Sequence, residues 1–199
     1  MVSRKDAAKG SSSRQKDEGG GFLSKRVERN LDSISAQWER ELGAFCARIE
    51  KDSMPLWRKL FLYGVDELGE IRLGYEIARR LLATLYTLVY DFEVSVPPDK
   101  QNCSIELRLG RFECVSGSSR IPELLNTSLV KERMEALGIT DIRMEVVSQE
   151  RIGRVRMVGL VGSSTWNMIP PVLHSISFRE GECIKAVELM RMIAVALRG

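Results

Sequence analysis

The sequence is poor in residues that commonly bind metals. It contains one histidine, His174, and its four cysteines include no Cys-x-x-Cys pair. Zinc sites are usually built from three or four Cys and His ligands, some of them closely spaced. The sequence therefore predicts no metal site. It also lacks a nucleotide-binding motif, so we expect no cofactor. The cysteines are Cys46, Cys103, Cys114 and Cys183.

Long apolar runs are missing as well. No run approaches the roughly 18 residues of a membrane span, and residues 1–21 contain no apolar core of a signal peptide. Together with the unpaired spacing of the cysteines, these absences favour a reducing, intracellular location. We expect a cytoplasmic or nuclear protein.

No catalytic set of residues stands out. A Ser-His-Asp or Cys-His mechanism would have to use His174, which lies mid-strand beside Ile176 and Phe178. We interpret it as a partly buried strand histidine. The glycine-containing stretch 159–164 lacks the Gly-Lys-Ser/Thr ending of a phosphate loop, which indicates an ordinary strand-exit loop. The sequence thus favours a non-enzymatic protein.

The charge is nearly balanced, with 30 basic and 27 acidic residues and a net charge of +3. Residues 1–21 hold five basic and three acidic residues, hence +2 of that charge, and almost no large apolar side chain. Such a segment predicts a disordered polar tail. A few basic residues of the predicted sheet could join the tail in contacting an anionic partner, either RNA or an anionic membrane surface. The anion-contact candidates are Arg4, Lys5, Lys9, Arg14, Lys16, Arg143, Arg154 and Arg156.

Helical periodicity dominates the part that follows the tail. Apolar residues recur at steps of 4-4-3-4-4-3-4 over 22–51, which predicts one long helix. Ser53 and Pro55 suit the first turn of a second helix that stops near Gly64. A third helical pattern spans 69–89. We expect an N-terminal helical arm of about three helices, with 22–68 forming the arm of a single domain.

Alternating apolar residues then predict about five strands, over 92–96, 105–109, 142–146, 155–161 and 172–178. The first two are expected to pair as a hairpin, with a β-bulge at Gly110. Two further helices are predicted over 118–137 and 181–198. The order favours an α+β fold over 22–199, with a mostly antiparallel sheet in a core of 69–199 and the two helices packed on it.

The apolar stripe of the first helix suggests that the protein binds a partner. We hypothesise a structural or assembly protein that self-associates as a homo-oligomer or binds another protein through its N-terminal helices. In layout it is like a small viral matrix or capsid-associated protein, which suggests association with a virion. The alternative is an RNA-binding module that uses the tail and the sheet arginines. The residues expected at the partner interface are Leu31, Ile34, Trp38, Leu42, Phe45 and Trp166.

Overall fold

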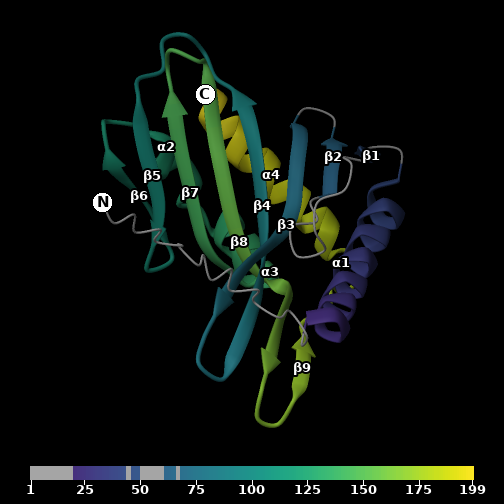
Figure 1. Cartoon of the computed structure of the whole chain (residues 1–199). Coiled ribbons are helices and arrows are strands. Elements are labelled where there is room, and N and C mark those ends of the chain that lie inside the picture. Colours follow the sequence, from purple (N-terminus) through teal and green to yellow (C-terminus); the bar gives the residue numbers. More distant parts are fainter. Residues whose placement is uncertain (1–19, 44–45, 50–60, 66–67) are drawn as a thin grey trace, which may run out of the picture.

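The computed structural model describes residues 20–43, 46–49, 61–65 and 68–199. Within these ranges the predicted α+β fold is confirmed: a helix at the N-terminal end is followed by an antiparallel sheet with further helices packed on it (Figure 1). Judged by length and hydropathy, no helix in these ranges could cross a membrane. In chain order the elements are α1 (Gly20–Leu42), β1 (Cys46–Ile49), β2 (Phe61–Val65), β3 (Gly69–Arg79), β4 (Ala83–Ser95), β5 (Cys103–Arg108), β6 (Arg111–Ser116), α2 (Ile121–Leu125), α3 (Ser128–Leu137), β7 (Ile139–Val147), β8 (Ile152–Asn167), β9 (Val172–Ser175) and α4 (Glu182–Arg198).

All nine strands of the described ranges belong to one antiparallel sheet. Its order is β1-β2-β3-β4-β8-β7-β5-β6, and β9 pairs with the end of β8. Helices α2, α3 and α4 lie behind this sheet in Figure 1, and α1 stands beside them near β1 and β2. In the part of the chain that the structure describes, no helix covers the opposite face. We call this opposite face the open face.

The core lies between the sheet and α4. Side chains of a strand point alternately to its two faces, so each strand buries every second residue. On β4, Tyr90, Phe92 and Val94 are almost fully buried, whereas Glu93 faces out. Burying each large apolar side chain contributes about 1.5–3 kcal/mol. The buried α4 residues that meet the sheet include Cys183, Val187, Met190, Ile193 and Leu197.

A wide irregularity in β8 bends the sheet away from the body. Leu88 of β4 pairs with Gly159 of β8 and Tyr86 pairs with Ser164, so the register shifts here and residues 160–163 of β8 correspond to Thr87 alone on β4. The Ser163 hydroxyl closes this bulge: it accepts a hydrogen bond from the Leu88 amide at 2.8 Å and donates one to the Gly159 carbonyl at 2.7 Å. Bulges strengthen the local bend and twist. Beyond the bulge, the β3–β4 and β8–β9 hairpins project together below the body in Figure 1.

The predicted arm of three helices is wrong. The first helix ends at Leu42 rather than near 51, because Gly43 adopts the left-handed conformation, with φ of +52°, that commonly ends helices. Residues 46–49 form β1. The predicted second helix lies largely outside the described residues, and its last part, from 61 onward, belongs to β2.

The predicted third helix, 69–89, is two strands. Residues 69–79 form β3 and residues 83–95 form β4, joined by a tight turn. The same apolar residues fit both periods: Ile71 and Tyr75 are four apart, but Leu73 between them is also buried. Leu81 and Leu82 appeared to continue the helical stripe, yet they are exposed in the turn.

The predicted hairpin between 92–96 and 105–109 is also wrong. β4 pairs with β3 and β8, whereas β5 pairs with β6 and β7. Gly110 lies in the turn between β5 and β6, with φ of +77°, and is not a bulge. The remaining elements follow the prediction more closely. The helix predicted over 118–137 is present as α2 and α3, and the last helix is α4.

Candidate functional site

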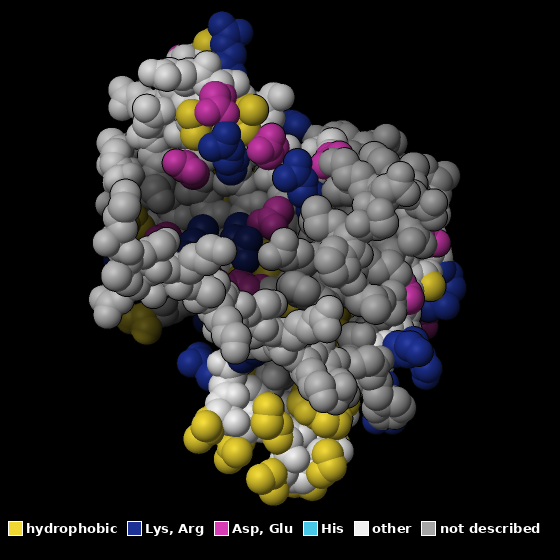
Figure 2. Space-filling model, in the orientation of Figure 1, with side chains coloured by type: hydrophobic (Ala, Val, Ile, Leu, Met, Phe, Trp, Pro, Cys, Tyr) yellow, Lys and Arg dark blue, Asp and Glu magenta, His cyan; other side chains and the backbone are white. Residues whose placement is uncertain are grey.

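The open face is hollowed by a depression of about 620 Å³. Figure 2 shows Lys, Arg, Asp and Glu side chains gathered on the floor of this hollow. Five neighbouring strands, β3, β4, β8, β7 and β5, supply the side chains, because each strand turns every second residue toward this face. The hollow is therefore a product of strand order and of sequence alternation together.

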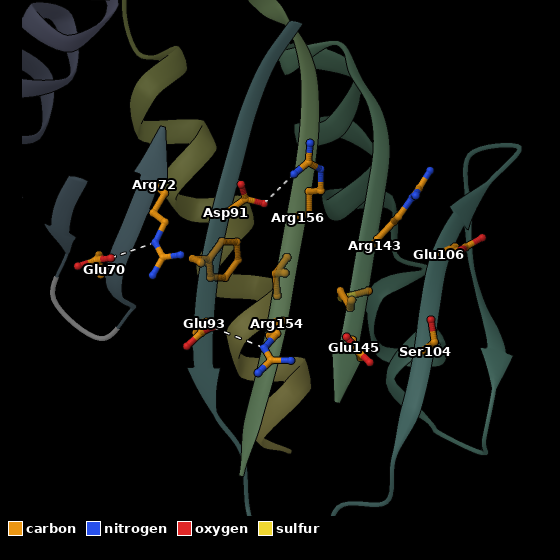
Figure 3. A pocket seen from close by; sticks show the side chains of 13 residues that line it. Glu70, Arg72, Asp91, Glu93, Ser104, Glu106, Arg143, Glu145, Arg154 and Arg156 are labelled. Carbon is orange, nitrogen blue, oxygen red and sulfur yellow. Dashed lines mark hydrogen bonds and ion pairs between the residues drawn. The ribbon is translucent and has the colours of Figure 1, made fainter. Parts of the chain in front are cut away.

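The charged side chains lie in two rows across the strands (Figure 3). The register of the sheet places the residues of the first row directly opposite one another on successive strands, and those of the second row lie two positions away along each strand. The first row is Arg72, Asp91, Arg156, Arg143 and Glu106. The second row is Glu93, Arg154, Glu145 and Ser104.

Ion pairs hold the arginines of the first row. The Arg156 guanidinium lies 2.7 Å from a Glu76 carboxylate oxygen and 3.5 Å from one of Asp91. Arg143 Nε lies 3.0 Å from Asp141 Oδ2 on its own strand. All these side chains are 33% exposed or more. Exposed pairs contribute only about 0–1 kcal/mol each, so a bound ligand could replace one at little cost.

The second row and the β3 end are paired in the same way. Arg154 contacts Glu93 on β4 at 3.6 Å and also pairs with Glu150. Arg72 Nε lies 3.1 Å from Glu70 Oε1. These contacts orient the guanidinium groups before any partner arrives, which reduces the entropy lost on binding.

Arg143 and Arg156 lie directly opposite each other at the centre of the face. Their side chains extend in the same direction from neighbouring strands in Figure 3. Like charges directly opposite one another are unfavourable in a sheet, and two guanidinium groups can share one carboxylate through charge-assisted hydrogen bonds. A carboxylate added between them could therefore bind both guanidinium groups.

The carboxyl group beside this pair has an altered pKa. Burial raises the pKa of Asp91, although the positive charges of Arg156 and Arg72 lower it. The nearby negative charge of Glu76 raises it further. The first row therefore already holds a carboxylate with a weakened preference for its charged form.

The structure brings Arg143, Arg154 and Arg156 together on one face, but it surrounds them with carboxylates. Four arginines and five acidic residues line the hollow, which gives it a net charge of −1. Polyanions bind where positive charge accumulates, and this lining holds no excess of it. The acidic lining residues are Glu70, Asp91, Glu93, Glu106 and Glu145.

The apolar stripe of α1 is buried in the core of its own chain. Trp38 is completely buried, with its ring 5.9 Å from that of Tyr90 between the centroids, and Leu31, Ile34 and Leu42 are at most 7% exposed. These side chains are not accessible to a partner in the folded protein. The helical spacing identified the buried face of α1, but it could not say that the sheet and α4 would cover it.

A polar network fastens α1 to the sheet. The Asn30 side-chain amide donates hydrogen bonds to Tyr75 Oη at 2.7 Å and to Ser164 Oγ at 3.0 Å. The Tyr75 hydroxyl in turn donates to the Gly162 carbonyl at 2.7 Å. Burial raises the pKa of Tyr75 to about 12, with the hydrogen bonds of Asn30 and Ser164 acting in the opposite direction. The network joins α1, β3 and β8 at the bulge.

The other predicted site residues lie apart from the hollow. Trp166 is half-buried within β8, and His174 on β9 is exposed rather than partly buried. The stretch 159–164 continues β8 through the bulge and is not an exit loop. The remaining candidates lie outside the described residues: Arg4, Lys5, Lys9, Arg14, Lys16 and Phe45.

Sequence reasoning missed two exposed apolar surfaces. One is a groove of about 800 Å³ along α3 and α4, lined by residues that include Leu124, Leu129 and Val195. The other is the pair of projecting hairpin turns, which Figure 2 shows as a cluster of hydrophobic side chains below the body. The available signal was the presence of apolar residues in turns, where glycine and polar residues are usual.

A family described as "Protein of unknown function (DUF3156)" matches residues 40–197, which is more than half of the chain. The chain belongs to this family. The DUF3156 match begins near the end of α1 and runs almost to the end of α4, so it includes every residue of the open face described above. No curated protein matches the chain. No solved structure matches it.

Proposed function

We propose that this protein is a non-enzymatic binding or assembly protein that holds a partner protein against the open face of its sheet. The observation that carries the proposal is the opposed pair Arg143 and Arg156 at the centre of a hollow of about 620 Å³. Such a pair suits an acidic side chain of the partner, which would bind between the two guanidinium groups.

The surrounding charges favour a protein over a nucleic acid. The hollow carries side chains of both signs of charge and a net charge of −1. A protein surface with matching positive and negative groups complements this pattern, whereas a phosphate backbone meets repulsion from the five carboxylates. A second copy of this chain is one such protein, because a face that carries both signs can be self-complementary.

An intracellular location accords with this proposal. Cys103, Cys114 and Cys183 are free thiols. Thiols persist in that form in reducing compartments.

Charge reversal tests the proposal. The double variant Arg143→Glu/Arg156→Glu and wild type would be used to capture partners from the native host, with and without nuclease. The matched control is Arg120→Glu/Lys131→Glu, which makes the same charge change at exposed residues of the helical side. We expect a protein that wild type and control retain, that the open-face variant loses, and that nuclease does not release.

Two results would contradict it. Equal capture by the open-face variant and the control would show that the open face is not the binding surface. Loss of the captured protein after nuclease treatment would favour an RNA-mediated role instead.

A further inference from the structure

We propose that the two projecting hairpin turns form a docking surface for an anionic lipid membrane. We call this surface the double-hairpin tip. It consists of Leu81, Leu82, Met168, Ile169, Pro170, Pro171 and Val172.

Hydrogen bonds hold the two turns side by side. The Arg80 amide donates to the Ala83 carbonyl at 2.7 Å, which closes the first turn around Leu81 and Leu82. The Met168 amide donates to the Leu82 carbonyl at 2.9 Å, which ties the second turn to the first. The two turns are therefore joined at the end of the extension formed by β3, β4, β8 and β9 (Figure 1).

The tip exposes large apolar side chains where turns normally carry polar ones. Leu81 is 90% exposed and Ile169 is 78% exposed. Leu82, Met168 and Val172 are exposed by 55%, 48% and 37%. Burying these side chains in the fold would stabilise it, so their exposure on a projection indicates an external partner.

The charges near the tip have one sign. Arg79 and Arg80 are exposed directly beside the leucines, and no acidic residue occurs in 77–90 or in 151–179. Basic residues beside an inserted apolar group are attracted to the negative surface of anionic lipids. Apolar insertion and charge attraction would thus act at the same place.

Aromatic side chains lie where the lipid headgroups would be. Tyr86 pairs in register with Ser164, and Thr84 with Trp166, so Tyr86 and Trp166 point to the same face of the extension. Both are half-buried. Trp and Tyr are enriched at membrane–water interfaces, because their rings are apolar and their N–H and O–H groups are polar.

The shape of the tip favours a bilayer over a protein. A standard protein interface uses about 20–30 residues on each side, whereas the tip has seven and is convex. A lipid surface needs no complementary shape, since acyl chains and headgroups rearrange around an inserted side chain.

Vesicle flotation with the full chain tests this surface. Vesicles of phosphatidylcholine alone are compared with vesicles that also contain phosphatidylserine. We expect wild type to bind the anionic vesicles, Leu81→Ser/Ile169→Ser to lose binding, and Arg79→Gln/Arg80→Gln to bind about fivefold more weakly for each arginine removed. The matched control is Leu109→Ser, which removes a fully exposed leucine from the β5–β6 turn and should leave binding unchanged.

Tryptophan fluorescence provides a second measurement. Brominated lipids should quench the emission of wild type more than that of Trp166→Phe, because Trp166 lies at the end of β8, two residues before Met168 of the tip. Two outcomes overturn the proposal: wild type does not bind anionic vesicles, or the leucine–isoleucine variant binds them as well as wild type does. Thermal melts of each variant establish that it is folded before binding is measured.

Discussion

Gly162 is the residue on which the packing of the β8 bulge depends most. Its φ is +85°, a conformation that L side chains rarely adopt. A Cβ at this position would lie 2.6 Å from Leu88 Cδ2 and 2.8 Å from Phe178 Cε2. Glycine therefore meets two requirements here, the backbone conformation and the close approach of two core side chains. Its carbonyl also anchors the hydroxyl of Tyr75.

Gly162→Ala should lower the free energy of unfolding by about 2–4 kcal/mol, the sum of backbone strain and overpacking. The matched control is Gly110→Ala, because Gly110 has a similar φ of +77° but nothing within 4 Å of the added Cβ. The free energy of unfolding of Gly110→Ala should fall by only about 1 kcal/mol. Urea unfolding of both variants measures the difference, and equal losses would contradict the packing argument.

Tyr75 should make stability depend on alkaline pH. Its pKa is about 12 in the folded protein and about 10 when unfolded. Between these values the unfolded chain loses a proton that the folded chain keeps, so ionisation favours unfolding and stability falls as pH rises. The stabilisation is fully present below pH 10.

The slope attributable to Tyr75 is up to about 1.4 kcal/mol per pH unit. Tyr75→Phe lacks the titrating hydroxyl, so it should lose less stability than wild type between pH 10 and 12. Denaturant titrations of both proteins over this range supply the comparison. Because the other alkaline titrations are common to both, parallel curves would mean that the folded chain does not hold this proton.

At the scale of elements, α1 is part of the core rather than a free arm. Trp38→Ala should therefore lower the free energy of unfolding by about 3–5 kcal/mol, through lost burial and a new cavity. Trp38→Phe keeps an aromatic ring, so its free energy of unfolding should fall by less than that of Trp38→Ala, and the variant should remain folded. The control Arg29→Gln changes an exposed residue of the same helix. Its free energy of unfolding should stay within about 0.5 kcal/mol of the wild-type value.

Sedimentation of the folded variants completes this test. Their mass should equal that of wild type, because the stripe contacts its own chain. A drop in oligomer mass in Trp38→Phe without loss of stability would instead support an interface role for α1.

The sequence patterns identified some elements and not others for a physical reason. The α4 pattern keeps its spacing of three and four over 17 residues, with no alternative period. In β3, buried Ile71 and Leu73 alternate with half-buried Tyr75 in the same set, but apolar residues at helical spacing overlap them. Strand pairing decides between the two periods: β3 pairs with β2 and β4, and β4 pairs in turn with the distant β8. Periodicity is local, whereas sheet pairing is not.

The same limit applies to the open face. Alternation along one strand correctly predicts that Arg154 and Arg156 project together. It cannot reveal that Glu76 and Asp91 lie beside Arg156, since those residues come from β3 and β4, about 65–80 positions away in the sequence. The arginines therefore looked like a basic patch until the strand order placed carboxylates among them.

At the scale of the whole molecule, two exposed surfaces of different chemistry belong to one sheet. The hollow on the open face is lined by charged side chains of both signs, with a net charge of −1. The double-hairpin tip is apolar and has two arginines beside it. The β8 bulge separates them by bending the extension away from the body. A molecule of this form could bind a protein on the open face while its tip rests on a membrane.

Site-specific photo-cross-linking in the native host tests the binding role of the open face most directly. Ser104, half-buried in the second row of the hollow, is replaced by p-benzoylphenylalanine, and the control places the same group at the exposed Arg120 on the helical side. We expect a discrete protein adduct from position 104 that is absent from position 120, with twice the chain mass if the partner is a second copy. No adduct from position 104, or the same adducts from both positions, would contradict it.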